Sequence, residues 1–309
     1  MKFSSTKDLI SGAWSDLNAQ GELYEASSSE QSVFQGSFKE ILGWSATLNN
    51  PSARMIHSPN FNEGLAVARF LYLIRGTNTV EEIAFYAPRV MDFSDDGIHL
   101  FGSSYGFKIF KDDRFWNMVE KLQTTKNSKR LYFPIFTEDD FLRDSKDIPC
   151  AIGFLLEPRG NVLNVTLLMR ANDAQKLLPY NLFEFSLLHE CIAVASGMTI
   201  GEFSYYAGSL HLRGDDTTIT ENPWDDASTT TMKPVTSFTK EIYELILEKE
   251  EQLRKGIPLT KKEQYVEFVV DLVSDLDEFW RGIFYSLAEY GYKSYYKEEL
   301  LLSLPHNHE

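Results

Sequence analysis

Two β-prone stretches followed by an apolar helix constrain the fold of this chain most. Residues 151–156 and 162–169 are β-prone, and the Pro-Arg-Gly-Asn sequence at residues 158–161 between them predicts a hairpin. Residues 182–196 form an apolar run of helical length, and a further strand is predicted over residues 203–207. We therefore expect an α/β fold in which a mixed twisted sheet packs against helices.

The other segments predict more helices and one loop-rich stretch. Helices are expected over residues 64–74, 113–122, 238–255 and 261–302, a strand over residues 131–136, and a loop over residues 214–235. We accordingly divide the chain into a polar N-terminal arm (1–30), a main domain (31–213), a linker or loop (214–236) and a helical region that packs on the core (237–309).

The acidic composition disfavours one class of partner. With 45 Asp and Glu against 30 Lys and Arg, the net charge of -15 argues against a broad nucleic-acid surface. No apolar run approaches the roughly 20 residues that span a bilayer, and residues 1–8 lack an apolar signal core. The two cysteines, Cys150 and Cys191, do not make a disulfide framework. We expect a cytoplasmic protein that binds neither nucleic acid nor membrane.

Four short motifs follow one another in the central part of the chain. They are Pro-Cys at Cys150, Met-Arg-Ala-Asn-Asp over residues 169–173, Pro-Tyr-Asn ending at Asn181, and Gly-Ser-Leu-His ending at His211. This set resembles the nucleotide site of the thymidylate synthase family, which has a Pro-Cys thiolate, an Arg-Ser-x-Asp phosphate strand, a Pro-Phe-Asn base reader and a Gly-x-x-His sugar contact. The spacings agree without an insertion. The resemblance covers roughly residues 37–213.

The resemblance implies a thymidylate synthase-like fold and a covalent reaction on a pyrimidine nucleotide. Cys150 would be the nucleophile that attacks C6 of the base, after which C5 captures a one-carbon unit from 5,10-methylenetetrahydrofolate. Tyr105, in a Tyr-Gly pair like that of the family, would hydrogen-bond in the active site. Taken alone, a cysteine before a β-prone run is more often buried structure than nucleophile, and we expect Cys191 to be a core residue.

The resemblance also assigns residues to the substrate phosphate. Arg170 would bind the 5′-phosphate, since a planar guanidinium suits a bidentate oxyanion contact. Lys129 and Arg130 stand where the family has an arginine pair that reaches the neighbouring subunit, which implies a C2 homodimer. Ala171 takes the place of the serine on the phosphate strand.

Three further residues correspond to contacts with the base, the sugar and the cofactor. Asn181 would read the pyrimidine through its carboxamide, although an asparagine there is equally suited to cap a helix that begins at residue 182. His211 would contact the sugar hydroxyl. Asp173 would contact the pterin of the folate.

Several positions depart from the family pattern. Arg69 stands where the catalytic glutamate belongs, and a cation cannot accept the hydrogen bonds through which that glutamate organises proton transfer. Phe34 replaces an arginine that binds phosphate, Leu177 replaces a glycine near the folate space, and Arg213 replaces a tyrosine beside the sugar. These exchanges leave three hypotheses open.

The first hypothesis is folate-dependent C5 hydroxymethylation of a pyrimidine nucleotide, with a cytidylate as the favoured substrate. Lys129 together with Ala171 resembles the cytidylate hydroxymethylases of nucleoside-antibiotic pathways. The second is a non-catalytic homologue that binds a nucleotide or pairs with an active paralogue, as all four exchanges, at Arg69, Phe34, Leu177 and Arg213, would favour. The third is a transferase in which Arg69 and Arg213 recognise another nucleoside-like anion.

Overall fold

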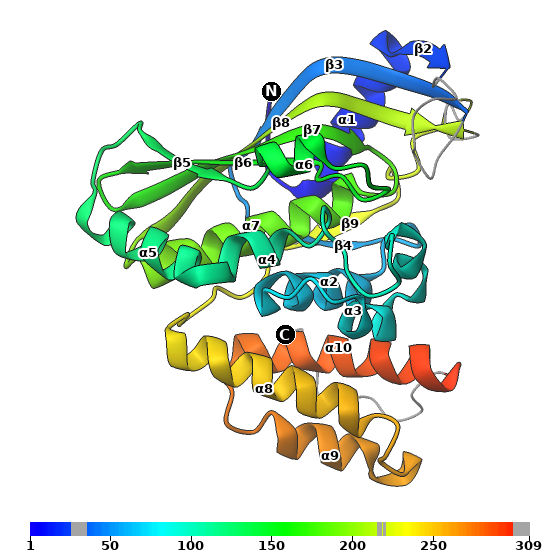
Figure 1. Ribbon diagram of the computed structural model, residues 1–309, viewed down its shortest axis with the longest axis vertical. Coiled ribbons are helices and arrows are strands. Elements are labelled where there is room, and N and C mark those ends of the chain that lie inside the picture. Colours follow the sequence, from blue (N-terminus) through cyan, green and yellow to red (C-terminus); the bar gives the residue numbers. More distant parts are fainter. Residues whose placement is uncertain (26–35, 215–217, 219–220, 299–309) are drawn as a thin grey trace.

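A seven-stranded mixed sheet forms the upper layer of the molecule in Figure 1. The computed structural model describes residues 1–25, 36–214, 218 and 221–298. The strands lie in the order β1-β3-β8-β7-β6-β5, and β2 pairs with β3. β7 and β8 are parallel, whereas β6 and β3 are antiparallel to their neighbours β7 and β8, so the sheet is mixed as predicted. The bounds are β1 Lys2–Phe3, β2 Glu22–Glu25, β3 Ser37–Leu48, β5 Leu131–Pro134, β6 Ala151–Arg159, β7 Val162–Asp173 and β8 Thr199–Arg213.

The hairpin between β6 and β7 has a tighter turn than the sequence predicted. Both strands extend to the residues that flank positions 160–161, so Pro158 lies within β6. Gly160 has a φ of 61°, a left-handed conformation that glycine adopts without steric cost. The register of this hairpin brings Cys150, directly before β6, next to Arg170 of β7, whose backbone N–H donates to the Cys150 carbonyl oxygen at 2.7 Å.

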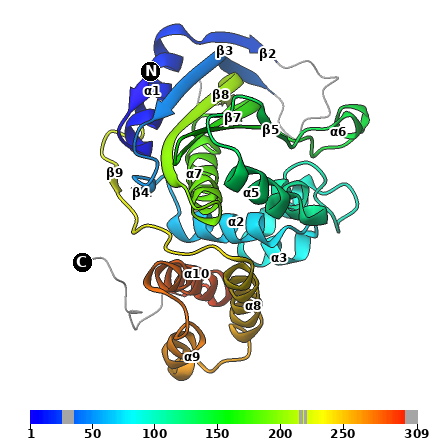
Figure 2. The ribbon, with the colours of Figure 1, turned by 90° about the vertical axis from the view of Figure 1, so that its left-hand side faces the viewer.

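Helix α7 (Leu178–Ala195) lies within the curve of the sheet (Figure 2). It begins four residues before the predicted start, because Pro179 fits the first turn, where a missing N–H removes no hydrogen bond. Asn181 is therefore inside the first turn and does not cap the helix, so that alternative is wrong. Gly197, with a φ of 67°, follows the helix end. Nearly all of α7 is buried, which explains why apolar residues occur on all of its faces.

The prediction of a polar N-terminal arm over residues 1–30 is wrong for most of that segment, which instead contains a packed helix. Helix α1 (Thr6–Gln20) packs against β3 and α7. Its stripe of Leu9, Ala13 and Leu17, spaced by four residues, is fully buried. The surrounding serines and charges hid this stripe in the composition. The last part of the arm, residues 26–30, lies outside the described residues.

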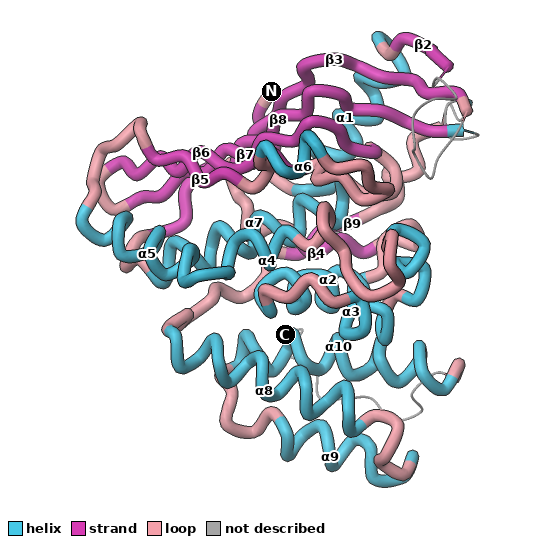
Figure 3. The backbone as a smooth tube through the Cα atoms, in the orientation of Figure 1, coloured by secondary structure: helices cyan, strands magenta, loops and turns pink. Residues whose placement is uncertain are grey.

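Below the sheet, helices form further layers (Figures 1 and 3). α2 (Glu63–Arg75) packs between α7 and the C-terminal α10. Among the described residues, no helix combines the length and the apolarity needed to cross a bilayer. The other helices before residue 240 are α3 Val80–Tyr86, α4 Tyr105–Phe110, α5 Arg114–Thr124, α6 Glu138–Leu142 and the 3-10 turns Pro88–Phe93 and Lys111–Asp113.

The predicted helical C-terminal extension is confirmed. It consists of α8 (Lys240–Gly256), α9 (Tyr265–Leu272) and α10 (Glu278–Tyr296), with a 3-10 turn at Lys262–Gln264. The single helix predicted over residues 261–302 is two helices, because Asp277 accepts the N–H of Trp280 and caps a new start.

The segment predicted as a linker or loop is partly structured where it is described. β9 (Ser228–Thr230) pairs with β4 (Met55–His57), and Trp224 is fully buried. These contacts hold the segment against the loop that precedes α2. Residues 215–217 and 219–220 lie outside the described residues, and the domain boundaries stay a prediction.

His189 on α7 gives the folded state a dependence on pH. Its Nε2 donates to the Leu163 carbonyl oxygen at 2.8 Å, and burial lowers its pKa from 6.5 to about 4. The unfolded chain therefore binds a proton between these two values that the folded protein does not. This contribution to stability is complete above pH 6.5 and is lost as the pH falls toward 4, by about 3 kcal/mol.

We expect the His189→Gln variant to lack this part of the acid destabilisation. Urea unfolding at pH 7.5, 6 and 5 gives the free energy of unfolding of each protein at each pH. This free energy should fall less steeply with decreasing pH in the variant than in the wild type. Parallel pH profiles for the two proteins would contradict the assignment.

Candidate active site

A cavity of about 850 Å³ opens at the end of the parallel pair β7 and β8. Its walls come from the carboxyl ends of both strands, from α2, α4 and α7, and from the segment before β6. The carboxyl ends of parallel strands are where α/β sheets bind ligands, and the volume is large for a small-molecule site. Of the residues predicted from the sequence, the lining includes Arg69, Tyr105, Cys150, Arg170, Ala171, Asp173, Asn181, His211 and Arg213.

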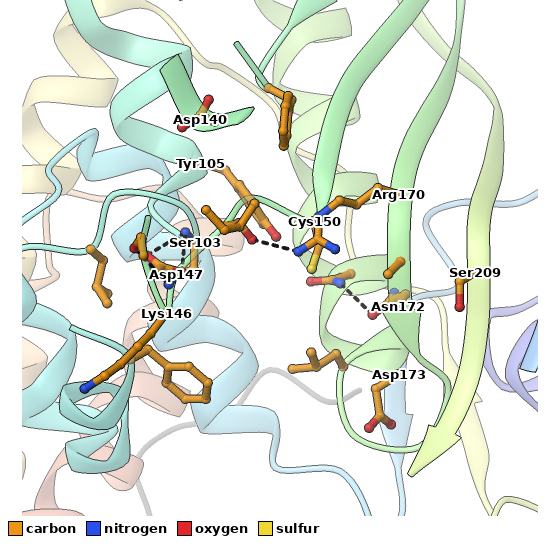
Figure 4. Close-up of a pocket in the computed structure, with 18 of the residues that line it drawn as sticks. Ser103, Tyr105, Asp140, Lys146, Asp147, Cys150, Arg170, Asn172, Asp173 and Ser209 are labelled. Atoms are coloured by element: carbon orange, nitrogen blue, oxygen red, sulfur yellow. Dashed lines mark hydrogen bonds between the residues drawn. The ribbon is translucent and has the colours of Figure 1, made fainter. Parts of the chain in front are cut away.

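Cys150 lies in the wall of this cavity, close to Tyr105 and Arg170 (Figure 4). Burial raises the pKa of its thiol, and Arg170 opposes this rise. Asp147 raises the pKa further, whereas a hydrogen bond from Tyr105 lowers it. Cys150 therefore faces a cavity beside charged and polar groups. Cys191, by contrast, is fully buried on α7, as expected for a core cysteine.

Arg170 holds the segment that leads to Cys150. Its Nε donates to the Pro149 carbonyl oxygen at 2.9 Å, and one terminal nitrogen donates to that of Ile148 at 3.2 Å. The side chain is otherwise exposed at the cavity. Arg170 can therefore present a guanidinium edge to an anion while it positions the cysteine.

The Asn181 carboxamide belongs to a chain of hydrogen bonds that joins α7 to β7, β8 and α2. Its Nδ2 donates to Asn172 Oδ1 at 3.2 Å, and Asn172 Nδ2 donates to the Tyr205 hydroxyl at 2.5 Å. Its Oδ1 accepts from a terminal nitrogen of Arg69 at 3.5 Å. With these partners, the carboxamide oxygen of Asn181 faces Arg69 and its nitrogen faces Asn172. No sequence pattern indicated Tyr205, whereas Asn172 lies inside the phosphate-strand motif, between Arg170 and Asp173.

Arg69 is paired with a carboxylate that the sequence analysis missed. Its Nε donates to Oε1 of Glu184 on α7, and its guanidinium lies 5.5 Å from the centroid of the Tyr180 ring. Glu184 also lines the cavity, with a side chain that is 4% exposed. Burial raises the pKa of Glu184, and the charge of Arg69 opposes the rise. A sequence signal for Glu184 does exist. This residue follows Asn181 by three residues, a spacing that places both side chains on one face of the helix.

Asp173 and Arg213, the last residues of β7 and β8, form an ion pair in the cavity lining. Arg213 Nε donates to Asp173 Oδ2 at 2.6 Å, while Oδ1 accepts the backbone N–H groups of Gln175 and Lys176. His211 lines the same wall. Burial lowers the pKa of His211 and Asp173 raises it, so the imidazole is mostly neutral at pH 7.

A loop that the sequence did not indicate closes one side of the cavity. The Asp147 carboxylate accepts the backbone N–H groups of Gly102 and Ser103 at 2.8 and 2.9 Å. A Cβ atom at position 102 would meet the Asp147 carbonyl oxygen at 2.1 Å, so only glycine allows this approach. The contact fixes the segment that leads to Cys150.

The remaining positions singled out from the sequence differ in their placement. Leu177 and Ala171 both line the cavity. Lys129 and Arg130 are exposed before β5 and do not contribute to this lining. Phe34 lies outside the described residues. Among those that are described, no cluster of three or more His, Cys, Asp or Glu residues is arranged to hold a metal ion.

Comparison with known proteins places the chain in a family. The model of the family "Thymidylate synthase" matches residues 64–245. The deoxyuridylate hydroxymethyltransferase of Bacillus phage SP01 is 28% identical over 202 residues, which cover 58% of this chain and 51% of the phage protein. That of Pseudomonas phage M6 is 26% identical over 179 residues, which cover 56% and 47%. The thymidylate synthase of Clostridium beijerinckii is 22% identical over 150 residues, which cover 48% and 56%.

The chain spans about half the length of these curated relatives. The family match extends over more than half of the chain and includes every cavity residue from Arg69 to Arg213. The mixed sheet with helices on its concave side agrees with the fold that the four motifs implied. The protein is therefore a divergent member of the thymidylate synthase family.

Proposed function

We propose that this protein hydroxymethylates C5 of a uracil nucleotide, with Cys150 as the nucleophile. The position of Cys150 at the cavity, with Arg170 beside it and Asn181 in the same lining, is the observation that carries the proposal. The two phage relatives are named for hydroxymethyl transfer to deoxyuridylate, which supports the same reaction class.

The Cys150 thiolate can begin the reaction by adding to C6 of the base. The C5–C6 π electrons then move toward O4, which makes C5 a carbon nucleophile. A new bond would form from C5 to the one-carbon unit, and the C5 proton would leave. The electron pair of the broken C5–H bond would then expel the folate nitrogen from the one-carbon unit, which releases tetrahydrofolate and leaves a methylene group doubly bonded to C5. Hydroxide from water would add to that methylene carbon, and loss of the sulfur from C6 would restore the C5–C6 double bond. No electrons are gained or lost overall.

The cavity has room for a folate beside a nucleotide. Part of its lining is apolar, formed by Ile83, Val90, Phe93 and Leu100, and suits an aromatic ring system. 5,10-Methylenetetrahydrofolate supplies a one-carbon unit at the oxidation level of formaldehyde. Asp173 remains the proposed contact for its pterin, and His211 that for the sugar of the nucleotide.

The hydrogen bonds of Asn181 favour uracil over the cytosine expected from the sequence. With Oδ1 toward Arg69 and Nδ2 toward Asn172, the carboxamide can still accept one hydrogen bond and donate one. N3–H and O4 of uracil complement that pair. Cytosine needs the flipped carboxamide, which would set donor against donor at Arg69 and would require Asn172 to flip as well.

We therefore expect dUMP to bind at least about tenfold more tightly than dCMP, the effect of one mismatched pair of hydrogen bonds. Thermal-shift titrations with dUMP, dCMP and CMP would measure the three affinities. Equal or tighter binding of a cytidylate would contradict this assignment and restore the substrate expected from the sequence.

The reaction itself is tested with dUMP that carries tritium at C5, incubated with 5,10-methylenetetrahydrofolate. We expect tritium release and a nucleotide product with the mass of the hydroxymethyl derivative. No release from dUMP, dCMP or CMP at high enzyme concentration would exclude the proposal. Binding of dUMP without release would identify the non-catalytic alternative instead.

We also propose a C2 homodimer in which Lys129 and Arg130 reach the partner's nucleotide phosphate. Their exposure before β5, away from the lining of this protomer's own cavity, supports that arrangement. Sedimentation that shows only monomer would exclude it.

A further inference from the structure

Glu184 is a buried carboxylate at the cavity that none of the steps above uses. We propose that it is the proton-transfer carboxylate of this site, with Arg69 as the residue that positions it. The inference rests on the proposed function. It assigns to α7 the acidic group that the sequence lacks at position 69 of α2.

The placement of Glu184 beside the base-reading residue is the first support. It follows Asn181 by three residues on α7, so both side chains leave the same helix face and line the same cavity. Arg69 contacts both, through Nε to Glu184 and through a terminal nitrogen to Asn181. The carboxylate therefore lies near the edge of the base that Asn181 would bind.

The second support is that Glu184 keeps an oxygen available. Oε1 accepts from Arg69, and among the described residues no hydrogen bond to Oε2 is found. The other buried carboxylates of the lining are bonded differently. Asp147 and Asp173 accept backbone N–H groups, and Asp140 binds Lys108 and the backbone of Thr137. Those three acids hold loops and turns in place, whereas Glu184 has a cation as its one described partner.

The chemistry of the base requires such a group. After sulfur adds to C6 and C5 forms its new bond, the C5–H bond must break so that its electron pair can re-form the enolate toward O4. Oε2 of Glu184 can take that proton through a water molecule. The ionised carboxylate is the form that accepts it, and the adjacent guanidinium stabilises that form against the effect of burial.

The Glu184→Gln variant tests the proposal because it keeps the shape and removes the base. We expect tritium release from dUMP to fall by roughly 10²- to 10⁴-fold, while the affinity for dUMP changes by less than about threefold. Release within about threefold of the wild type would overturn the proposal, given that the wild type releases tritium. A wild type that releases none overturns the proposed function instead, so the two failures are distinguishable.

Glu190→Gln is the matched control. Glu190 is also a buried acid on α7 that pairs with an arginine, Arg54, but it does not line the cavity. We expect this variant to lose stability and to keep its rate of tritium release per folded molecule. An equal loss of rate in both variants would show that Glu184 acts only through the structure of α7.

A second variant gives a readout that a structural role would not change. Replacing Arg69 by methionine removes the charge that holds the pKa of Glu184 down. Tritium release needs both Glu184 and Cys150 ionised, so a logarithmic plot of release against pH should bend twice, at lower pH where Glu184 ionises and at higher pH where Cys150 does. In Arg69→Met the lower of these two midpoints should move to higher pH. An unchanged lower midpoint would overturn the proposal even if Glu184→Gln failed to fold.

Discussion

Replacing Cys150 by serine is expected to lower tritium release from C5 of dUMP by at least about 10⁴-fold. A serine hydroxyl is far less acidic than a thiol, so almost no anion is available to add to C6. Arg170, whose charge favours the thiolate of Cys150, cannot offset that difference. The variant should still bind dUMP, because the proposed contacts to phosphate and base come from other residues. The release assay and a thermal-shift titration measure the two quantities separately.

The second cysteine supplies the control for this variant. Cys191→Ser introduces the same chemical change in the fully buried interior of α7, away from the cavity. It should lower stability without changing the rate per folded molecule. A covalent adduct with 5-fluoro-dUMP, detected by mass analysis in the wild type and absent from Cys150→Ser, would identify the attacking atom. An adduct that persists in Cys150→Ser would contradict the assignment.

The central elements of the fold could be predicted because their sequence patterns are local. The β6–β7 hairpin and the apolar run of α7 are each recognisable within 20 residues, and the structure confirms both. Helix α1 was missed because its buried stripe is diluted by serines and charges. The pairing of β9 with β4 joins segments more than 150 residues apart, and no local pattern indicates it.

The same distinction between local patterns and distant pairings holds for the candidate site. Cys150, Arg170, Asn181 and His211 belong to short motifs, and the structure brings all four to one cavity. Pairings between distant residues were not predictable. The position of Arg69 was identified as a departure from the family, but its partner Glu184 lies 115 residues away on an apolar helix.

That pairing changes the interpretation of the departure. A lone cation at position 69 would argue against catalysis, since it removes the acidic group that moves protons. The arginine together with Glu184 keeps one carboxylate at the cavity and adds a cation that fixes Asn181. Under the role proposed for Glu184, the carboxylate of the site lies on α7 and its cationic partner on α2.

Breaking the buried pair of Arg54 and Glu190 should cost more stability than breaking an exposed ion pair. Arg54 is fully buried, a terminal nitrogen lies 2.5 Å from Glu190 Oε2, and its Nε donates to the Pro51 carbonyl oxygen at 2.8 Å. Glu190 Oε1 in turn accepts the backbone N–H of Val235 at 3.1 Å. We expect Arg54→Met to lower the free energy of unfolding by about 3 to 5 kcal/mol, because it leaves a buried carboxylate without its cation. Urea denaturation measures this loss.

A second substitution shows whether the loss of stability comes from the missing attraction between Arg54 and Glu190 or from the unpaired buried charge of Glu190. In Arg54→Met with Glu190→Gln, the amide oxygen can still accept the N–H of Val235, but no buried charge remains. The double variant should therefore be more stable than Arg54→Met alone by at least about 1 kcal/mol. The exposed pair of Lys2 and Glu202 is the surface control, where Lys2→Met should cost less than about 1 kcal/mol. A double variant no more stable than the single one would show that the stranded charge is not the source of the loss.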